Sequence, residues 1–339
     1  MSLHNSSSGV SKSIMSRRVF ITRTECEEPT IQLLRDGNFE VEVYDKPGKC
    51  PPEVLKEKLR SGVSALLVFC GDVINSEVID AGKDLRVVST FSVGFDHLDV
   101  EYMKSKGVIG TNTPGAVSVS TAETALVLIL MVLKRVQECQ SIMRTYEGTE
   151  AYFPPAWVLG NNLNRRVVGI LGLGRIGLEI AKRVLPFGPQ RIMYSGRSGP
   201  KEGVEFAEYV SFQDLISQSG VLIIACSLNP ETKHLVDKEV FKNMKNSAVV
   251  INIARGGIIE QDDMVEALKS NQIAGAGIDV MTPEPLSRDH SLMNMSNVVV
   301  FPHIGTNTVE TRLDMGKMAA ENIINALSPE TEEVTNRIA

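Results

Sequence analysis

Short runs of β-branched and other apolar residues alternate with segments of helical periodicity along the first third of the chain. The apolar runs are VFIT, VEVY, ALLVF and RVVSTF, and the helical segments include PTIQLLRDG and PPEVLKEKLRSG. Apolar strands separated by amphipathic helices are typical of parallel βαβ units. The pattern therefore predicts an open α/β unit in the N-terminal part of the chain.

A second series of the same kind begins with VVGIL at Val167 and continues through RIMY, VLIIAC, AVVINI, AGAGIDV and NVVVFPH. It predicts another parallel α/β unit. Between the two series, TAETALVLILMVLKRVQECQSIMR predicts one long helix that is apolar around much of its circumference, as at a domain or subunit junction. The late segment TNTVETRLDMGKMAAENIINALSPE is helical by pattern and is expected to close back over the N-terminal unit.

The composition limits the kinds of partner that the protein can have. The chain has 339 residues, 43% of them hydrophobic, and a formal net charge of −6, which argues against nucleic acid as a ligand. Its longest apolar run, residues 125–133, is far too short to span a membrane. The length favours two domains. Small molecules are therefore the expected partners, with no role for a membrane.

Five cysteines are present, without CxxC pairs or Cys/His ligand spacing, and they are Cys26, Cys50, Cys70, Cys139 and Cys226. An odd set of this kind fits a reducing compartment, so the sequence predicts a cytoplasmic protein with no disulfide framework and no metal site.

The motif GLGRIG follows the apolar run VVGIL and precedes the helical segment LEIAKRVL. Strand, glycine turn and helix in this order predict a dinucleotide site, because the glycines permit a tight turn, close approach of the pyrophosphate, and packing of the helix on the strand. The expected cofactor-binding residues of this loop are Gly172, Gly174, Arg175, Ile176 and Gly177.

An acidic residue normally follows about 20 residues later and binds the ribose hydroxyls of NAD. Here the second strand ends instead in Ser195, Gly196, Arg197 and Ser198. A carboxylate would repel a 2′-phosphate, whereas the guanidinium and the hydroxyls can donate to it. The sequence therefore predicts a preference for NADP, with NAD possible. A plain strand-to-loop turn is the alternative interpretation.

Three later fragments, INIARGG, DVMTPEP and FPHIG, bring Arg255, Glu284 and His303 just past predicted strand ends. In doubly wound sheets the carboxyl ends of the strands form the ligand site, so the three side chains are expected to converge. Arginine offers a planar fork for a carboxylate, histidine a proton near neutral pH, and glutamate a partner that orients the imidazole. Together they predict carbonyl reduction. Taken singly, each is more often structural.

These fragments in this order, with SVGFDHLD upstream, resemble the D-2-hydroxyacid dehydrogenases from about Arg17 onward. Within that family, YSGRS, AWVLG, LPFGPQR and IACSLNPET are most similar to the members that reduce glyoxylate and hydroxypyruvate. The resemblance implies reduction of a short 2-oxo acid to the D-2-hydroxy acid, with hydride from the nicotinamide. A nucleotide-sensing transcriptional corepressor and a phosphoglycerate dehydrogenase-like enzyme remain alternatives.

Individual residues acquire roles from the same resemblance. His303 becomes the general acid/base, Glu284 its partner and Arg255 the group that orients the substrate, while the backbone of Val93 and Gly94 binds the substrate carboxylate. Trp157 resembles an aromatic residue that reaches a neighbouring subunit's pocket, although a lone tryptophan more often fills a core or interface. The remaining positions expected to line the cofactor site are Ser227, Ile253, Asp279 and Gly305.

The resemblance also implies a homodimer built around the long helix, and a substrate domain made from both chain ends. The expected fold is two doubly wound, Rossmann-like α/β domains with parallel sheets. The expected divisions are a disordered leader at 1–16, the first part of the substrate domain at 17–116, the nucleotide-binding domain at 117–308 and the closing substrate segment at 309–339.

Overall fold

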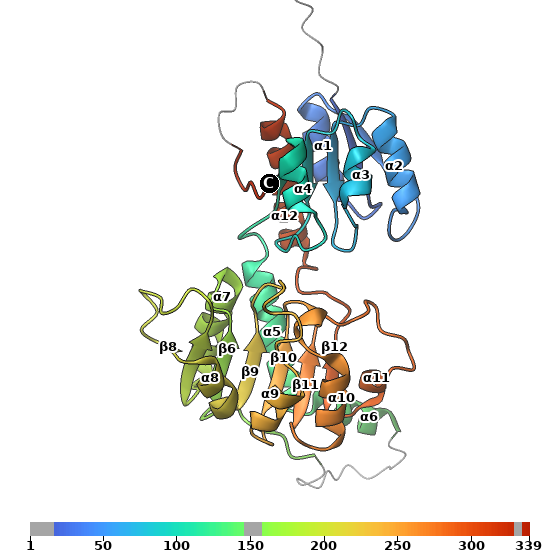
Figure 1. The fold of residues 1–339 in the computed structure, drawn as a ribbon. Helices are drawn as coiled ribbons and strands as arrows, with labels where there is room; N and C mark the ends of the chain where they lie inside the picture. Colours follow the sequence, from blue (N-terminus) through green and yellow to red (C-terminus); the bar gives the residue numbers. More distant parts are fainter. Residues whose placement is uncertain (1–16, 146–157, 329–333) are drawn as a thin grey trace, which may run out of the picture. The chain divides into compact units, whose positions relative to one another are not determined.

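The structure is a computed structural model that describes residues 17–145, 158–328 and 334–339 (Figure 1). The described chain forms two compact units. Unit 1 combines the residues up to Pro114 with those from Leu313 onward, and unit 2 is Gly115–Arg312. Each unit has one parallel sheet with helices on both faces, which confirms the predicted fold class.

Unit 1 is built on a five-stranded sheet in the order β2-β1-β3-β4-β5, with every neighbouring pair parallel. Its strands are short, β-branched and mostly buried, as parallel strands covered on both faces must be. Its elements are β1 (Arg18–Ile21), α1 (Glu28–Asp36), β2 (Glu40–Val43), α2 (Pro52–Arg60), β3 (Ala65–Val68), α3 (Ser76–Asp80), β4 (Val87–Thr90), α4 (Val100–Lys106), β5 (Ile109–Thr111) and, after unit 2, the greater part of α12 (Val309–Ala326).

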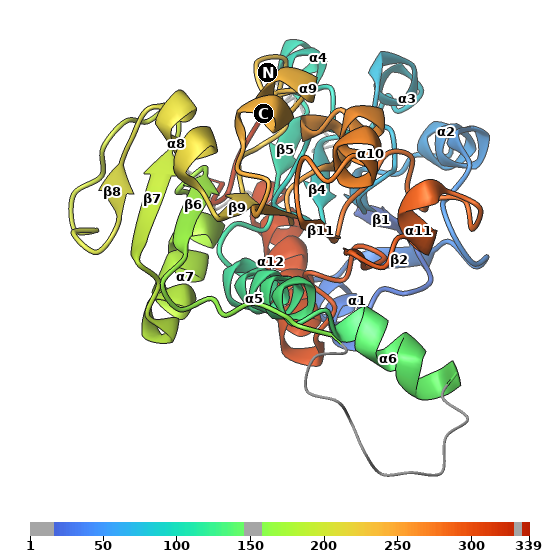
Figure 2. The ribbon, with the colours of Figure 1, turned by 90° about the horizontal axis from the view of Figure 1, so that it is seen from below.

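Two helical layers cover the sheet of unit 1. Helices α2, α3 and α4 lie on one face and bury Leu55, Leu59, Val78 and Met103 against it, while α1 and α12 lie on the other (Figure 2). The segment that follows unit 2 is therefore half of the covering layer on one face, and unit 1 depends on it for a closed core.

Hydrogen bonds tie this returning segment to the first part of the chain. The Ser89 hydroxyl donates to the Ala319 carbonyl at 3.1 Å, and the buried Asn322 amide donates to the carbonyl of Asn112, just after β5, at 2.9 Å. The C-terminal residues add to the β5 edge through the Ile338 N–H, which donates to the Gly110 carbonyl at 2.8 Å. The two chain ends thus form one folded unit.

Unit 2 is built on a seven-stranded parallel sheet in the order β12-β11-β10-β9-β6-β7-β8. The chain starts in the middle at β6, runs to one edge, and then returns to build the other half, which is the doubly wound arrangement. Its elements are α5 (Ser118–Leu133), α6 (Val136–Thr145), β6 (Val167–Leu171), α7 (Arg175–Val184), η1 (Leu185–Phe187), β7 (Arg191–Ser195), β8 (Glu208–Tyr209), α8 (Phe212–Gln218), β9 (Val221–Ile224), α9 (Lys238–Asn243), β10 (Val249–Asn252), η2 (Gly256–Ile258), α10 (Gln261–Lys269), β11 (Gly275–Ile278), α11 (Ser291–Asn294) and β12 (Val298–Val300).

Two buried clusters lie on opposite faces of this sheet. One is formed with α5 and α7, and the other with α8, α9 and α10 (Figure 2). Because both faces are covered, the loops at the carboxyl ends of the strands are the places where the sheet can present functional groups.

The prediction of one long helix between the two series of strands is wrong, because the structure has two helices there. Helix α5 ends at Leu133 and α6 begins at Val136, with Arg135 between them in the left-handed region at φ +52°. The Leu133 carbonyl accepts from the Asn161 N–H at 2.6 Å, and the Arg135 guanidinium pairs with Glu138. These contacts divert the backbone, and sequence periodicity contains no sign of them.

Two negative features concern the described parts of the chain. In residues 17–145, 158–328 and 334–339, no helix has the length and apolar character needed to cross a membrane. All five cysteines are free thiols.

The attachment of α12 to unit 1 can be tested at Asn322. Replacing Asn322 by Ala should lower the free energy of unfolding by about 1–3 kcal/mol, because the buried Asn112 carbonyl and the Asn336 amide both lose a partner. Urea unfolding followed by circular dichroism measures the change. Asn325→Ala, at a half-buried position of the same helix, changes helix propensity equally and is the control. Equal stability of the two variants would contradict the proposed tie.

Candidate active site

The glycine motif forms the loop between β6 and α7. Gly172 has φ +97°, which favours glycine, and its N–H donates to the Ser195 carbonyl at 2.8 Å. A Cβ on Gly177 would lie 2.2 Å from the Gly172 oxygen, so the helix packs directly on the turn. Around Gly174, at the N-cap of α7, a Cβ would meet nothing within 4 Å. The loop is tightly folded on one side and open on the other.

This open side fits the pyrophosphate of a dinucleotide. The first N–H groups of α7 have no partners inside the helix, and the helix dipole makes this end attractive to an anion. Arg175 and Ile176 are the first two residues of α7, the former exposed and the latter packed partly against the core. The backbone of Cys226, after β9, closes the inner side of the turn against Gly172.

The segment after β7 forms a pinned turn with an exposed tip. Ser195 is buried, the Gly199 N–H donates to the Gly196 carbonyl at 3.2 Å, and the Lys201 N–H donates to the Tyr194 hydroxyl at 2.7 Å. Arg197 and Ser198 project from this turn, and 82% of the Arg197 side chain is exposed. The guanidinium lies 3.7 Å from the Glu231 carboxylate. Such an exposed pair is weak, so the arginine is available to a stronger anion.

Two further predicted cofactor residues lie at neighbouring strand ends. Ser227 is exposed after β9, where its carbonyl accepts from the Thr232 hydroxyl at 2.7 Å. Ile253 is buried directly after β10, and its N–H donates to the Ile224 carbonyl at 3.4 Å. Both therefore belong to the same edge of the sheet as the glycine loop.

His303 and Glu284 form a hydrogen-bonded pair at the ends of β12 and β11. His303 Nδ1 lies 3.0 Å from Glu284 Oε2, and Glu284 Oε1 accepts from the Met281 N–H at 3.0 Å. About a third of each side chain is exposed, 30% for the histidine and 36% for the glutamate. The pair is accessible to a small molecule, and the bond from the Met281 N–H fixes the orientation of the Glu284 carboxylate.

The environment keeps Glu284 ionised. Burial acts to raise the pKa of Glu284, but the hydrogen bond and charge of His303, the Met281 N–H and the charge of Arg255 together lower the pKa below its usual value. An ionised carboxylate can only accept, so Nδ1 of His303 carries the hydrogen and donates it. This leaves Nε2 as the ring nitrogen that can give a proton to a ligand.

Arg255 lies just after β10, at the start of the short η2 turn. Its Nη1 donates to the Ala254 carbonyl at 2.9 Å, and the Asn252 amide donates to the Arg255 carbonyl at 3.0 Å. The next residue, Gly256, packs against the Met281 backbone so closely that a Cβ would lie 2.2 Å from it. The fold thus brings the turn that carries Arg255 against the loop that carries Glu284.

Asp279 and Gly305 have a clear structural connection to His303. The buried Asp279 carboxylate accepts from the Ile304 N–H at 2.7 Å and from the Gly305 N–H at 2.8 Å. Burial raises the pKa of Asp279, and these two N–H groups oppose the rise. The Ser120 hydroxyl of α5 donates to the Gly305 carbonyl at 2.8 Å. Sequence reasoning missed Ser120 because nothing near it in the chain marks it.

In unit 1, the predicted substrate-binding backbone lies in the loop after β4. The Ser92 hydroxyl donates to the Gly94 carbonyl at 2.6 Å, and the Asn112 amide donates to the Val93 carbonyl at 2.8 Å. The two carbonyls of this turn are thus held by side chains. Binding of a carboxylate by Val93 and Gly94 stays a prediction. Trp157 lies outside the described residues.

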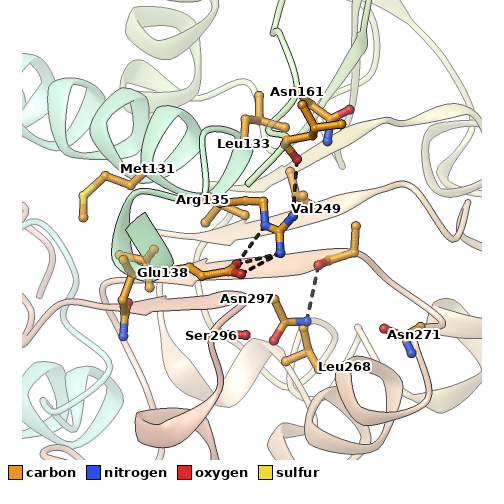
Figure 3. A pocket seen from close by; sticks show the side chains of 15 residues that line it. Met131, Leu133, Arg135, Glu138, Asn161, Val249, Leu268, Asn271, Ser296 and Asn297 are labelled. Atoms are coloured by element: carbon orange, nitrogen blue, oxygen red, sulfur yellow. Dashed lines mark hydrogen bonds and ion pairs between the residues drawn. The ribbon is translucent and has the colours of Figure 1, made fainter. Parts of the chain in front are cut away.

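A cavity of about 440 Å³ lies elsewhere in unit 2 (Figure 3). Val249 begins β10, Ala274 precedes β11 and Asn297 precedes β12, so the cavity is at the amino ends of the strands, opposite the glycine loop. The Arg135 guanidinium in its wall is paired with Glu138. The cavity is therefore separate from the candidate active site.

Comparison with known proteins agrees with this arrangement. Residues 126–305 match the NAD binding domain of the D-isomer specific 2-hydroxyacid dehydrogenases. Glyoxylate reductase/hydroxypyruvate reductase of Homo sapiens is 41% identical over 316 residues, which cover 92% of this chain and 95% of that protein.

Solved structures are similar over nearly the full length. The TT0316 protein of Thermus thermophilus has a TM-score of 0.87 at 35% identity, covering 95% of this chain and all of that one. The NADPH-dependent glyoxylate/hydroxypyruvate reductase of Sinorhizobium meliloti, in complex with NADP and malonate, has a TM-score of 0.84 at 28% identity. The match covers 96% of this chain and 97% of that one. The chain belongs to the D-isomer specific 2-hydroxyacid dehydrogenase family.

Proposed function

We propose that this protein reduces a short 2-oxo acid, glyoxylate or hydroxypyruvate, to the D-2-hydroxy acid, with NADPH as the preferred reductant. The observation that carries the proposal is the His303–Glu284 pair, 3.0 Å apart, with Arg255 on the turn that packs against the Met281 backbone of the glutamate loop. These are a proton donor, the group that orients it, and a fork for a carboxylate. The names of the relatives favour an enzyme of this kind over a corepressor or a phosphoglycerate dehydrogenase.

The residues of this chain divide the work as follows. Arg255 binds the carboxylate of the 2-oxo acid and sets the direction of its carbonyl. His303 gives the proton on Nε2 to the carbonyl oxygen, while Glu284 holds Nδ1 and stabilises the charged ring. The nicotinamide, when bound, supplies the hydride. For the reverse reaction, the same histidine accepts the hydroxyl proton.

The cofactor proposal rests on two parts of unit 2. The glycine loop and the first turn of α7 would hold the pyrophosphate, and Ser195, Arg197 and Ser198 would hold the adenosine ribose and its 2′-phosphate. The Arg197 guanidinium is exposed and makes a weak pair with Glu231, which supports a preference for NADP, and NAD remains acceptable. Ser227, Ile253, Asp279 and Gly305 would line the rest of the cofactor site.

We further propose, from the family resemblance, a homodimer in the cytoplasm whose ligands are small acids. Unit 1 would be the substrate domain, with Val93 and Gly94 donating to the substrate carboxylate, and unit 2 the nucleotide-binding domain. Val119 and Val127 of α5 are exposed apolar side chains that a second copy could cover.

The proton donor is tested by His303→Ala. Turnover of hydroxypyruvate with NADPH should fall by roughly 10²–10⁴-fold, as expected for the loss of a general acid, while the thermal unfolding midpoint changes little. The matched control is His234→Ala, because His234 Nδ1 makes a similar pair with Glu260 Oε2 at 2.9 Å and has no proposed role in the reaction. Parental turnover in His303→Ala would show that another group supplies the proton.

The orienting role of Arg255 is tested by Arg255→Lys. Lysine keeps the charge but loses the bidentate fork, so kcat/KM for the 2-oxo acid should fall by about 10- to 100-fold, with effects on both KM and kcat. NADPH affinity, measured by fluorescence titration, should stay unchanged. Kinetic constants equal to those of the parent would rule out bidentate binding.

Cofactor preference is tested at the turn after β7. Arg197→Ala should weaken NADPH binding by about 1.5–3 kcal/mol and leave NADH nearly unaffected, because only NADPH carries the 2′-phosphate. Ser195→Asp should move the ratio of kcat/KM values toward NADH. Arg191→Ala is the control, since Arg191 pairs with Glu208 and lies at the opposite end of β7. An unchanged ratio in both turn variants would mean that this segment is only a turn.

A further inference from the structure

The loop that carries Glu284 is held by a side chain that the site described above does not include. Gln261, the first residue of α10, binds Thr282 with both ends of its amide: Oε1 accepts from the Thr282 N–H at 3.0 Å, and Nε2 donates to the Thr282 carbonyl at 2.6 Å. Thr282 lies two residues before Glu284. One side chain thus satisfies both main-chain groups of a residue in an exposed loop.

Few side chains can make this pair of contacts. Among neutral side chains, the carboxamide of Asn or Gln places a donor and an acceptor side by side, which is what a peptide group requires. The helix that carries Gln261 is fixed, because Met264, Val265 and Leu268 of α10 are buried in the core of unit 2. The amide therefore connects the glutamate loop to a rigid element.

The same loop is in contact with the other functional residues. The Met281 N–H donates to Glu284 Oε1, and the Met281 backbone packs against Gly256, the neighbour of Arg255. A displacement of Thr282 would therefore move the carboxylate relative to both His303 and Arg255. Since proton transfer depends on distances of about 3 Å, a shift of about 1 Å would be costly.

We propose that Gln261 is a positioning residue, which keeps the Glu284 carboxylate at His303 Nδ1 by fixing Thr282. This inference rests on the proposed role of the His303–Glu284 pair as proton donor. Gln261 acts through Glu284 and is not itself a catalytic residue. Its specific requirement is a donor and an acceptor at one side chain, which glutamate cannot meet when ionised.

The titratable and charged groups around this connection are few among the described residues. Arg255, Asp279 and His303 act on Glu284, and His290 Nε2 lies 3.4 Å from Gln261 Nε2. His290 also caps α11, where its Nδ1 accepts from the Leu292 N–H at 3.3 Å. A His290→Gln variant therefore shows whether this neighbouring side chain affects the contact between Gln261 and Thr282.

The test compares Gln261→Met, which keeps the size of the side chain and removes both bonds, with Gln261→Glu, which keeps only the acceptor. For Gln261→Met we expect kcat for hydroxypyruvate to fall by roughly 10- to 100-fold, with an unchanged Kd for NADPH. The pH profile of kcat/KM should move in the same direction as in Glu284→Gln. The matched control is Asn243→Ala, which removes an amide that donates to the Glu239 carbonyl in α9 at 2.7 Å.

A double-mutant cycle gives the decisive readout. If Gln261 acts through Glu284, the Gln261→Met/Glu284→Gln double variant should have about the same kcat as Glu284→Gln alone, whereas independent effects would multiply. Gln261→Glu serves as the second variant should Gln261→Met fail to fold, and it should show the same non-additivity.

The outcomes separate this inference from the proposed function. Parental kcat and pH profile in Gln261→Met, or effects that multiply with those of Glu284→Gln, would overturn the positioning role. Parental turnover in His303→Ala would instead overturn the proposed proton donor. A loss in His303→Ala together with non-additive loss at Gln261 supports both.

Discussion

The Asp279 carboxylate fixes the backbone on which His303 stands. It is 1% exposed and accepts from two successive N–H groups, those of Ile304 and Gly305. His303 itself has φ +59°, a left-handed conformation that costs an L-residue about 1–2 kcal/mol. Such a conformation persists only where the surroundings over-determine it. Here the ends of β11 and β12 are joined by charge-assisted bonds, and the imidazole is aimed by the same constraint.

Two carboxylates hold His303 in different ways: Glu284 binds its imidazole, and Asp279 binds the backbone that follows it. The surroundings of each carboxylate determine these roles. Asp279 is buried and bound by backbone, and burial raises its pKa. Glu284 is partly exposed and bound by His303, with Arg255 nearby, and its pKa is lowered. Glu284 is therefore ionised and accepts the hydrogen bond from the imidazole. Its ionised form stabilises the folded state at pH values above its usual pKa, and this stabilisation is lost as the pH falls through the lowered pKa of the folded state. Asp279 fixes the backbone after β12 through the N–H groups of Ile304 and Gly305.

The loops of unit 2 that carry function follow adjacent strands of one parallel sheet. The glycine loop follows β6, the turn proposed to bind the 2′-phosphate follows β7, and the proposed catalytic residues follow β10, β11 and β12. Since the carboxyl ends of parallel strands share an edge, residues far apart in the chain become neighbours without special connections. Side chains from helices then fix the loops, Ser120 from α5 at Gly305 and Gln261 from α10 at Thr282. The sheet assembles the site, and the helices hold it in place.

The sequence by itself determined every strand except the short β5 and β8. It also determined the glycine turn, the missing acid after β7 and the order of the fragments that carry Arg255, Glu284 and His303. These signals are local: periodicity, turn residues and motif spacing all act within a few turns of chain. The tertiary structure alone decided that α5 ends at Leu133, because that break depends on Asn161 from beyond it. Only the tertiary structure showed that Asp279 accepts hydrogen bonds from the N–H groups after His303, and that Gln261 binds Thr282, 21 residues away. Hydrogen bonds between residues so distant in sequence exist only once the parallel sheet has brought the strand ends together.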